Sequence, residues 1–179
     1  MDIKLKRAPG VYLAGFMASG KTTVARLLAD RLGWDFIDLD AEIEAVEQTT
    51  IARLFESRGE PEFRRIETEA LRNLMRRIER GMPSVIALGG GSFVQPVNTT
   101  LLSDHGISIW LDCSFETIET RINSGIEEAD SRPLTRDREQ FRRLYDERRT
   151  VYARADYRVD ADCEVERAVD LILDLPCWK

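Results

Sequence analysis

Short runs suited to buried strands alternate along the chain with longer stretches that carry apolar residues at helical spacing. Five segments have the pattern of strands: 11–14 ("VYLA"), 34–40 ("WDFIDLD"), 84–88 ("SVIAL"), 107–112 ("ISIWLD") and 157–160 ("YRVD"). The first and third are apolar throughout, which is typical of strands that are covered on both faces. The second alternates apolar and acidic residues.

Helices are predicted between these strands. The predicted ranges are 21–32, about 41–57, 61–80, 114–122, 138–153 and 164–174. Gly33 ends the first of them, and Ser114 is a suitable N-terminal cap for the fourth. Strands that alternate with helices indicate βαβ units, so we expect a single α/β domain with a mainly parallel sheet between layers of helices.

Composition and charge exclude several classes of protein. Of the 179 residues, 43% are hydrophobic and 32% charged, as in ordinary globular proteins. The formal net charge of -6 argues against general nucleic-acid binding. No apolar run is long enough to cross a bilayer, and no signal peptide is evident, so a cytoplasmic protein is expected.

The three cysteines lack the spacing of metal ligands and are expected to be reduced and partly buried. The only histidine, His105, is expected in a surface loop.

The stretch "GFMASGKTT" at 15–23 contains the pattern of a phosphate-binding loop, G-x-x-x-x-G-K-[ST]. Gly15 and Gly20 allow backbone angles that point successive N–H groups inward, and the helix that follows adds its positive N-terminal end. Lys21 is expected to reach the β- and γ-phosphates of a nucleotide, and Thr22 to supply a hydroxyl to Mg²⁺. An incidental glycine turn is the alternative, but the strand before and the helix after the loop favour a nucleotide site.

Three classes of phosphate chemistry then compete. A GTPase-like switch needs a guanine-reading N-K-x-D, which the chain lacks, and an ATPase module usually has a strand that ends in a carboxylate, whereas "SVIAL" ends in "GGG". A small kinase fits better. Asp38 and Asp40, two apart on an extended segment, should point to one side, where one carboxylate holds Mg²⁺ and the other orients a hydroxyl and accepts its proton. The alternative is that Asp40 only caps a helix that starts at Ala41.

Two further segments suit a kinase. The glycines at 89–91 allow close approach of a ligand and expose backbone N–H groups, although a flexible turn is the alternative. Arg132, in the polar loop at 123–137, could close over ATP and stabilise the charge of the transferred group. The alternative for Arg132 is a solvated surface side chain.

With these segments in order, the chain resembles the shikimate kinases. The resemblance extends from about residue 11 to 160 and rests on "GFMASGKTTVARLLADRLGWDFIDLD", "IARLFESRGEPEFRRIE", "VIALGGGS", "SRPLT" and "ERRTVY". It implies a fold similar to nucleoside monophosphate kinases, with a five-stranded parallel sheet. The core is then expected at about 8–40, 80–122 and 154–176, a substrate-binding helical segment at about 41–79 and a lid at about 123–137.

The same resemblance implies transfer of the ATP γ-phosphoryl group to the 3-hydroxyl of shikimate, with ATP and Mg²⁺ as cofactors. It implies a catalytic set of Lys21, Asp40 and Arg132. Nucleotide contacts are implied for Ala18, Ser19, Gly20, Lys21, Thr22, Thr23, Arg121 and Arg132. Substrate contacts are implied for Asp40, Arg64, Gly89, Gly90, Gly91 and Arg148. Thr22 and Asp38 are implied as the Mg²⁺ ligands.

Shikimate, with one carboxylate and three hydroxyls, suits two guanidinium groups, an aspartate and backbone N–H groups. The second guanidinium belongs to Arg148 or Arg149, and the family spacing of four residues before a tyrosine selects Arg148 through Tyr152. The loop between Arg121 and Arg132 is longer and more acidic than the family pattern. We expect a monomer without nucleic-acid or membrane partners. A gluconate kinase or a non-catalytic nucleotide-binding regulator is the alternative function.

Overall fold

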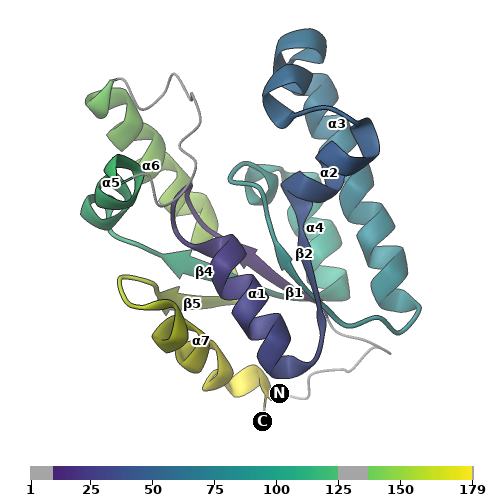
Figure 1. Ribbon diagram of the computed structural model, residues 1–179, viewed down its shortest axis with the longest axis vertical. Coiled ribbons are helices and arrows are strands. Elements are labelled where there is room, and N and C mark those ends of the chain that lie inside the picture. The colour runs from purple at the N-terminus through teal and green to yellow at the C-terminus, as the bar shows by residue number, and fades with distance from the viewer. Residues whose placement is uncertain (1–9, 125–136, 179) are drawn as a thin grey trace.

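A computed structural model describes residues 10–124 and 137–178 (Figure 1). Within these residues the strands are β1 (Gly10–Ala14), β2 (Asp35–Asp38), β3 (Ser84–Ala87), β4 (Gly106–Asp112) and β5 (Tyr157–Asp160). They form one parallel sheet in the order β2-β3-β1-β4-β5. The expected α/β fold with a five-stranded parallel sheet is therefore confirmed.

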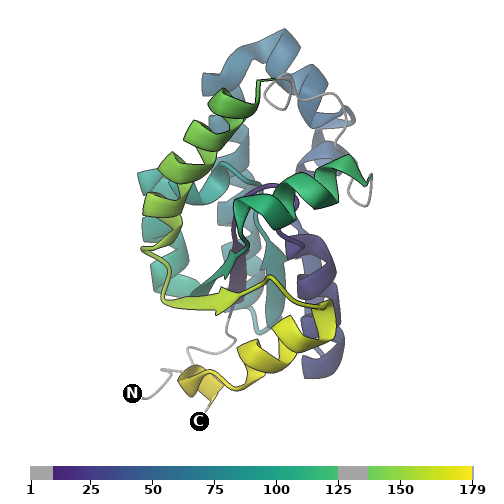
Figure 2. The same ribbon diagram turned by 90° about the vertical axis from the view of Figure 1, so that its left-hand side faces the viewer.

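Helices cover both faces of the sheet (Figures 1 and 2). On one face α1 (Lys21–Leu32) packs beside α7 (Val165–Leu173), and on the other α3 (Ile51–Glu79) packs beside α4 (Pro96–His105). The remaining elements lie around these layers: α2 (Leu39–Glu47), α5 (Phe115–Asn123), α6 (Arg138–Tyr152), and the short 3-10 turns η1 (Ser92–Val94) and η3 (Pro176–Trp178). β1 and β3 lie inside the sheet and are buried along their whole length, which explains their apolar sequences.

The predicted helix at 41–57 is wrong in two respects. The helix α2 begins at Leu39, so Asp40 lies in its first turn and not on the strand β2. It ends before Gln48, which has a left-handed backbone, and α3 then begins after Thr50, whose side chain accepts a hydrogen bond from the Arg53 N–H. A threonine that caps a helix is a strong local signal, and the apolar periodicity obscured it.

The helix α3 is bent where the sequence has "RGEP". Gly59 has a φ of 76°, outside the helical range, and Pro61 follows it. Proline lacks an N–H and is tolerated in a first turn, so the residues after Gly59 start a new helical segment. Arg64 lies just after this bend.

The helix α4 was not predicted. Its buried residues include Asn98, and its apolar residues show no helical stripe. His105 is the last residue of α4 rather than a loop residue: its Nδ1 lies 2.7 Å from the Leu101 carbonyl oxygen and its Nε2 3.0 Å from Glu79 Oε1. The first contact lies within α4, and the second joins the end of α4 to the end of α3.

The three cysteines are free thiols, as expected, with Cys113 and Cys177 buried and Cys163 partly exposed. Burial raises the pKa of Cys113 to about 11, which leaves this thiol protonated and unreactive near neutral pH. Within residues 10–124 and 137–178, no helix is both long and apolar enough to cross a bilayer.

Candidate active site

The carboxyl ends of the strands gather the predicted chemistry at one edge of the sheet. In the register of the sheet, Ala87 pairs with both Leu13 and Asp38, so β1, β2 and β3 end at the same level. The phosphate loop follows β1, Asp38 ends β2, and the glycines follow β3. β1 lies between β3 and β4, where the strand order reverses, and ligands of parallel sheets bind outside such a point.

The phosphate loop has the backbone that its glycines predict. The φ angles are 155° at Gly15 and 85° at Gly20. Gly20 precedes α1, and neither a side-chain cap nor an acidic residue lies at the start of this helix. By contrast, α2, α3, α5 and α6 each begin with a side chain that accepts their first N–H groups. The N-terminal end of α1 therefore offers its partial positive charge to an anion.

The loop is held from inside the protein by neighbours of several kinds. Lys21 Nζ donates to the Phe16 carbonyl oxygen at 2.8 Å, and Arg121 Nη1 donates to the Ala18 carbonyl oxygen at 3.2 Å. Ser19 is buried, and among the described residues its Oγ has no hydrogen-bond partner. The Ser19 hydroxyl is therefore available for a hydrogen bond within the phosphate loop.

Asp38 joins the end of β2 to the start of α1. Its Oδ2 accepts a 2.7 Å hydrogen bond from Thr22 Oγ1, and its Oδ1 accepts from the N–H groups of Asp40 and Ala41 at 3.1 and 3.2 Å. Asp38 is thus the cap of α2, a role that the sequence had suggested for Asp40. A hydroxyl and a carboxylate at this distance form a donor set that Mg²⁺ accepts, since the ion prefers a few oxygen ligands and keeps part of its water.

The prediction that Asp38 and Asp40 share one side of a strand is wrong, because the strand ends between them. Asp40 instead faces the three glycines at 89–91, called the glycine segment below. A Cβ built on Gly89 would lie 2.5 Å from Asp40 Oδ1. Only glycine at position 89 leaves room for the carboxylate there. The helical turn at Leu39 therefore brings Asp40 to the glycines while Asp38 stays beside Thr22.

Arg64 lies against the other end of the same glycine segment. A Cβ built on Gly91 would lie 2.8 Å from the Cζ of Arg64, whereas a Cβ on Gly90 would meet nothing within 4 Å. The Arg64 guanidinium also donates to Glu60 and, at 3.0 and 3.2 Å, to both oxygens of the buried Glu67. Gly89 and Gly91 thus admit one acidic and one basic side chain, and Gly90 between them faces open space.

The two candidate arginines of α6 have different surroundings. Arg149 Nη2 donates to Asp112 Oδ2 at 2.8 Å, and Arg158 contacts the same oxygen at 2.7 Å. Arg148 is half-buried, and its buried Nη1 has no hydrogen-bond partner among the described residues. Arg149 therefore serves an internal ion pair, and Arg148 has the buried donor capacity that an anionic ligand needs.

Tyr152 connects these groups, although the sequence used it only as a spacing marker. Its hydroxyl donates to the Gly90 carbonyl oxygen at 2.6 Å. Burial raises the pKa of Tyr152, and the nearby charges of Arg148 and Arg64 oppose that rise. Tyr152 lies one turn after Arg148 on α6, so its hydrogen bond to Gly90 brings this end of α6 to the glycine segment.

The helix α6 also contacts the phosphate loop. The ring of Phe16 lies 5.4 Å from the rings of both Phe141 and Tyr145, and the Tyr145 hydroxyl donates to the Cys113 carbonyl oxygen at 2.7 Å. The first half of α6 thus supports the phosphate loop, and its last residue, Tyr152, bonds to the glycine segment. Nothing in the periodicity distinguishes these aromatic residues from ordinary core residues.

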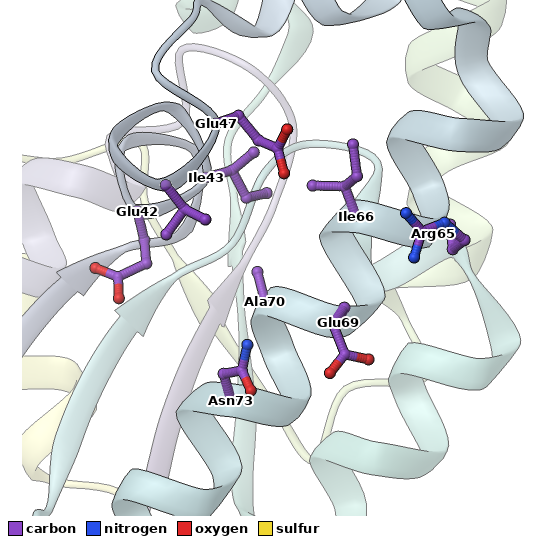
Figure 3. Close-up of a pocket in the computed structure, with 9 residues that line it drawn as sticks. Glu42, Ile43, Glu47, Arg65, Ile66, Glu69, Ala70 and Asn73 are labelled. Carbon is purple, nitrogen blue, oxygen red and sulfur yellow. The ribbon is translucent and has the colours of Figure 1, made fainter.

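A separate pocket of about 130 Å³ lies between α2 and α3 (Figure 3). Ile43 and Ile66 face each other across it, and Glu42 and Glu47 lie at its margin. Both carboxylates already pair with arginines, Glu42 with Arg77 and Glu47 with Arg58. None of the candidate site residues lines this pocket, so the chemistry belongs to the glycine side of α2 and α3.

Of the predicted closing loop at about 123–137, residues 125–136, which include Arg132, lie outside the described residues. Two of the other residues at the site, Glu67 and Tyr152, escaped sequence reasoning. Glu67 stands three residues after Arg64, which is the spacing of an ion pair on a helix, and this was the available signal.

Comparison with known proteins identifies the family of the chain. A family model described as shikimate kinase matches residues 17–175. A shikimate kinase from Ruegeria pomeroyi is 37% identical over 168 residues, which are 91% of this chain and 82% of the relative.

Solved structures give the same result. The crystal structure of shikimate kinase from Aquifex aeolicus has a TM-score of 0.78 and 33% identity, covering 92% of this chain and 94% of that one. Shikimate kinase from Acinetobacter baumannii, solved in complex with shikimate, has a TM-score of 0.77 and 34% identity, covering 93% of each chain. The chain therefore belongs to the shikimate kinase family.

Proposed function

We propose that this chain transfers the γ-phosphoryl group of ATP to the 3-hydroxyl of shikimate, giving shikimate 3-phosphate and ADP. The observation that carries the proposal is that Asp40 and Arg64 lie at the two ends of the glycine segment, beside the phosphate loop. Tyr152, one turn after Arg148 on α6, bonds to the glycine between them. Family membership and the shikimate complex of the A. baumannii relative support the choice of acceptor.

Two guanidinium groups would hold the carboxylate of shikimate. A guanidinium presents parallel N–H donors that match the two oxygens of a carboxylate. Arg64 is fixed by Glu60 and Glu67 and rests against Gly91, so little side-chain freedom remains to be lost on binding. The buried Nη1 of Arg148 would gain a partner from the same carboxylate.

Asp40 would hold and orient the acceptor hydroxyl. Its carboxylate lies at the opposite end of the glycine segment from Arg64, so a small ring could meet both groups at once. A carboxylate within hydrogen-bond reach of a hydroxyl can accept its proton as the oxygen attacks phosphorus. The open space at Gly90 is where the ring itself would lie.

The phosphate loop would hold ATP, with backbone N–H groups at residues 18–23 and Lys21 on the phosphates. Thr22 and Asp38 are the residues that would hold Mg²⁺, their oxygens being 2.7 Å apart. When bound, Mg²⁺ neutralises charge on the phosphate oxygens. Arg121 donates to the Ala18 carbonyl oxygen and so would steady the loop beside the nucleotide. Arg132 is proposed to approach the transferred group from the closing loop, as the family pattern implies.

A coupled assay of ADP release tests the acceptor. The purified chain should turn over MgATP with shikimate but not with gluconate or nucleoside monophosphates. Turnover with gluconate alone would show that the acceptor site has been misread. Absence of turnover with every acceptor, together with retained ATP binding, would indicate a nucleotide-binding regulator instead.

A further inference from the structure

A buried chain of hydrogen bonds joins the residue that follows the glycine segment to α3 and α4. Thr68 Oγ1 donates to Asn98 Oδ1 at 2.8 Å, and Asn98 Nδ2 donates to the Ser92 carbonyl oxygen at 3.0 Å. The Ser92 hydroxyl in turn donates to Glu67 Oε1 at 2.5 Å. Glu67 is the carboxylate that accepts from Arg64.

All the inner members of this chain are inaccessible to water. Asn98 and Ser92 have no exposed surface, Glu67 is 1% exposed and Thr68 8%. A buried polar group costs stability unless it is hydrogen-bonded, and an amide that lost one partner here could not recover it from solvent. The contacts of Asn98 are therefore obligatory, and they fix its side chain between α3 and the residue after the glycines.

These hydrogen bonds set the distance between α3 and the glycine segment. Thr68 and Arg64 are on the same helix, one turn apart, and Ser92 directly follows Gly91. Asn98 thus joins the helix of Arg64 to the segment against which the Arg64 guanidinium rests. If the Thr68–Asn98 contact is lost, α3 and the glycine segment can shift relative to each other, and Arg64 shifts with them.

We propose that Asn98, acting with Thr68, is a positioning residue that sets the place of Arg64 for binding the carboxylate of shikimate. The inference rests on the role proposed above for Arg64. It concerns the acceptor alone, because the described contacts of Asn98 and Thr68 involve neither the phosphate loop nor Asp38.

The test uses Thr68→Val, which keeps the shape of the side chain but removes the donor, so that it disturbs folding less than truncation of Asn98. We expect the KM for shikimate to rise roughly five- to tenfold, the value of about one hydrogen bond, and the KM for ATP to change by less than about twofold. Thr68→Ser, which keeps the hydroxyl, should restore the normal KM for shikimate. Thr100→Val is the matched control, since Thr100 on α4 bonds only to the carbonyl oxygen of Pro96 in its own helix and is exposed.

The same measurements in an Arg64→Ala background separate the two proposals. If Asn98 acts through Arg64, Thr68→Val should add no further rise in the KM for shikimate there, because coupled residues are not additive. An equal further rise would overturn this route of action. Should Thr68→Val in the native background lower the melting temperature without changing the KM for shikimate, or raise both KM values alike, the positioning role is wrong. If Arg64→Ala itself leaves the KM for shikimate unchanged, the role of Arg64 fails first, and the positioning role fails with it.

Discussion

The phosphate loop is one continuous run of sequence, whereas the proposed acid-binding site is assembled from α2, α3, α6 and the segment after β3. In the loop, backbone N–H groups supply the donors, and the neighbours in sequence determine their directions. At the acid-binding site the binding groups are side chains. Asp40 and Arg64 rest against Gly89 and Gly91 of another element, and Tyr152, on the same helix as Arg148, bonds to the Gly90 carbonyl oxygen.

This difference has consequences for mutation. With the role proposed for Lys21, its removal should take a charge from the reacting phosphates and slow the chemical step. Disturbance of the acid-binding site should mainly change the affinity for one substrate, and it can originate at residues that never touch the substrate. The four predictions below compare the two regions, in order of decreasing effect.

The largest effect is expected for Lys21→Ala in the phosphate loop. Loss of the ammonium group from the phosphates should lower kcat by at least about a thousandfold, because electrostatic stabilisation of the transferred group is a dominant part of phosphoryl transfer. Steady-state kinetics with saturating shikimate and ATP measure it. A kcat within tenfold of the native value would contradict the role of Lys21.

Arg148→Ala, at the acid-binding site, should raise the KM for shikimate roughly tenfold to a hundredfold while the KM for ATP changes little, since a charged donor is lost from one substrate. Arg149→Ala is the matched control on the same helix. It removes one ion pair of Asp112, so it should lower stability by roughly 1 kcal/mol, with both KM values near normal. If Arg149→Ala raises the KM for shikimate and Arg148→Ala does not, Arg149 and not Arg148 binds the carboxylate.

The glycines provide a smaller and more local test. Gly91 has a φ of -103°, which alanine adopts easily, so Gly91→Ala isolates the overlap of the new Cβ with Arg64. We expect a rise of about tenfold in the KM for shikimate. Gly90→Ala meets no atom within 4 Å and should leave the melting temperature unchanged. An unchanged KM for shikimate in Gly91→Ala would show that the overlap at Arg64 does not disturb binding.

The smallest effect is expected inside the phosphate loop itself. Ala18 is buried and has a φ of 58°, a left-handed conformation that costs a residue with a Cβ about 1 kcal/mol. Ala18→Gly removes this cost but adds freedom to the unfolded chain, worth about 0.4–1 kcal/mol. The free energy of unfolding in urea should therefore change by less than about 1 kcal/mol. A large loss would show that the methyl group of Ala18 packs against a neighbour that the loop needs.

The amino-acid sequence by itself determined the parts of this protein that depend on neighbouring residues. The phosphate loop, the five strands and the cap of α5 at Ser114 follow from local patterns, because backbone angles, capping and apolar periodicity act over a few residues. The same reasoning failed at α4, where the buried Asn98 interrupts the apolar pattern because its partners lie on other elements.

Only the tertiary structure decided what each polar residue of the site contacts. From the residues alone, Asp38 and Asp40 were equivalent members of a pair, and Arg148 and Arg149 were adjacent alternatives. The end of β2 sends Asp38 to Thr22 and Asp40 to Gly89, and packing of α6 gives Arg149 to Asp112. The physical reason is that a side chain's environment depends on which distant elements pack beside it, and that information is not contained in its neighbours along the chain.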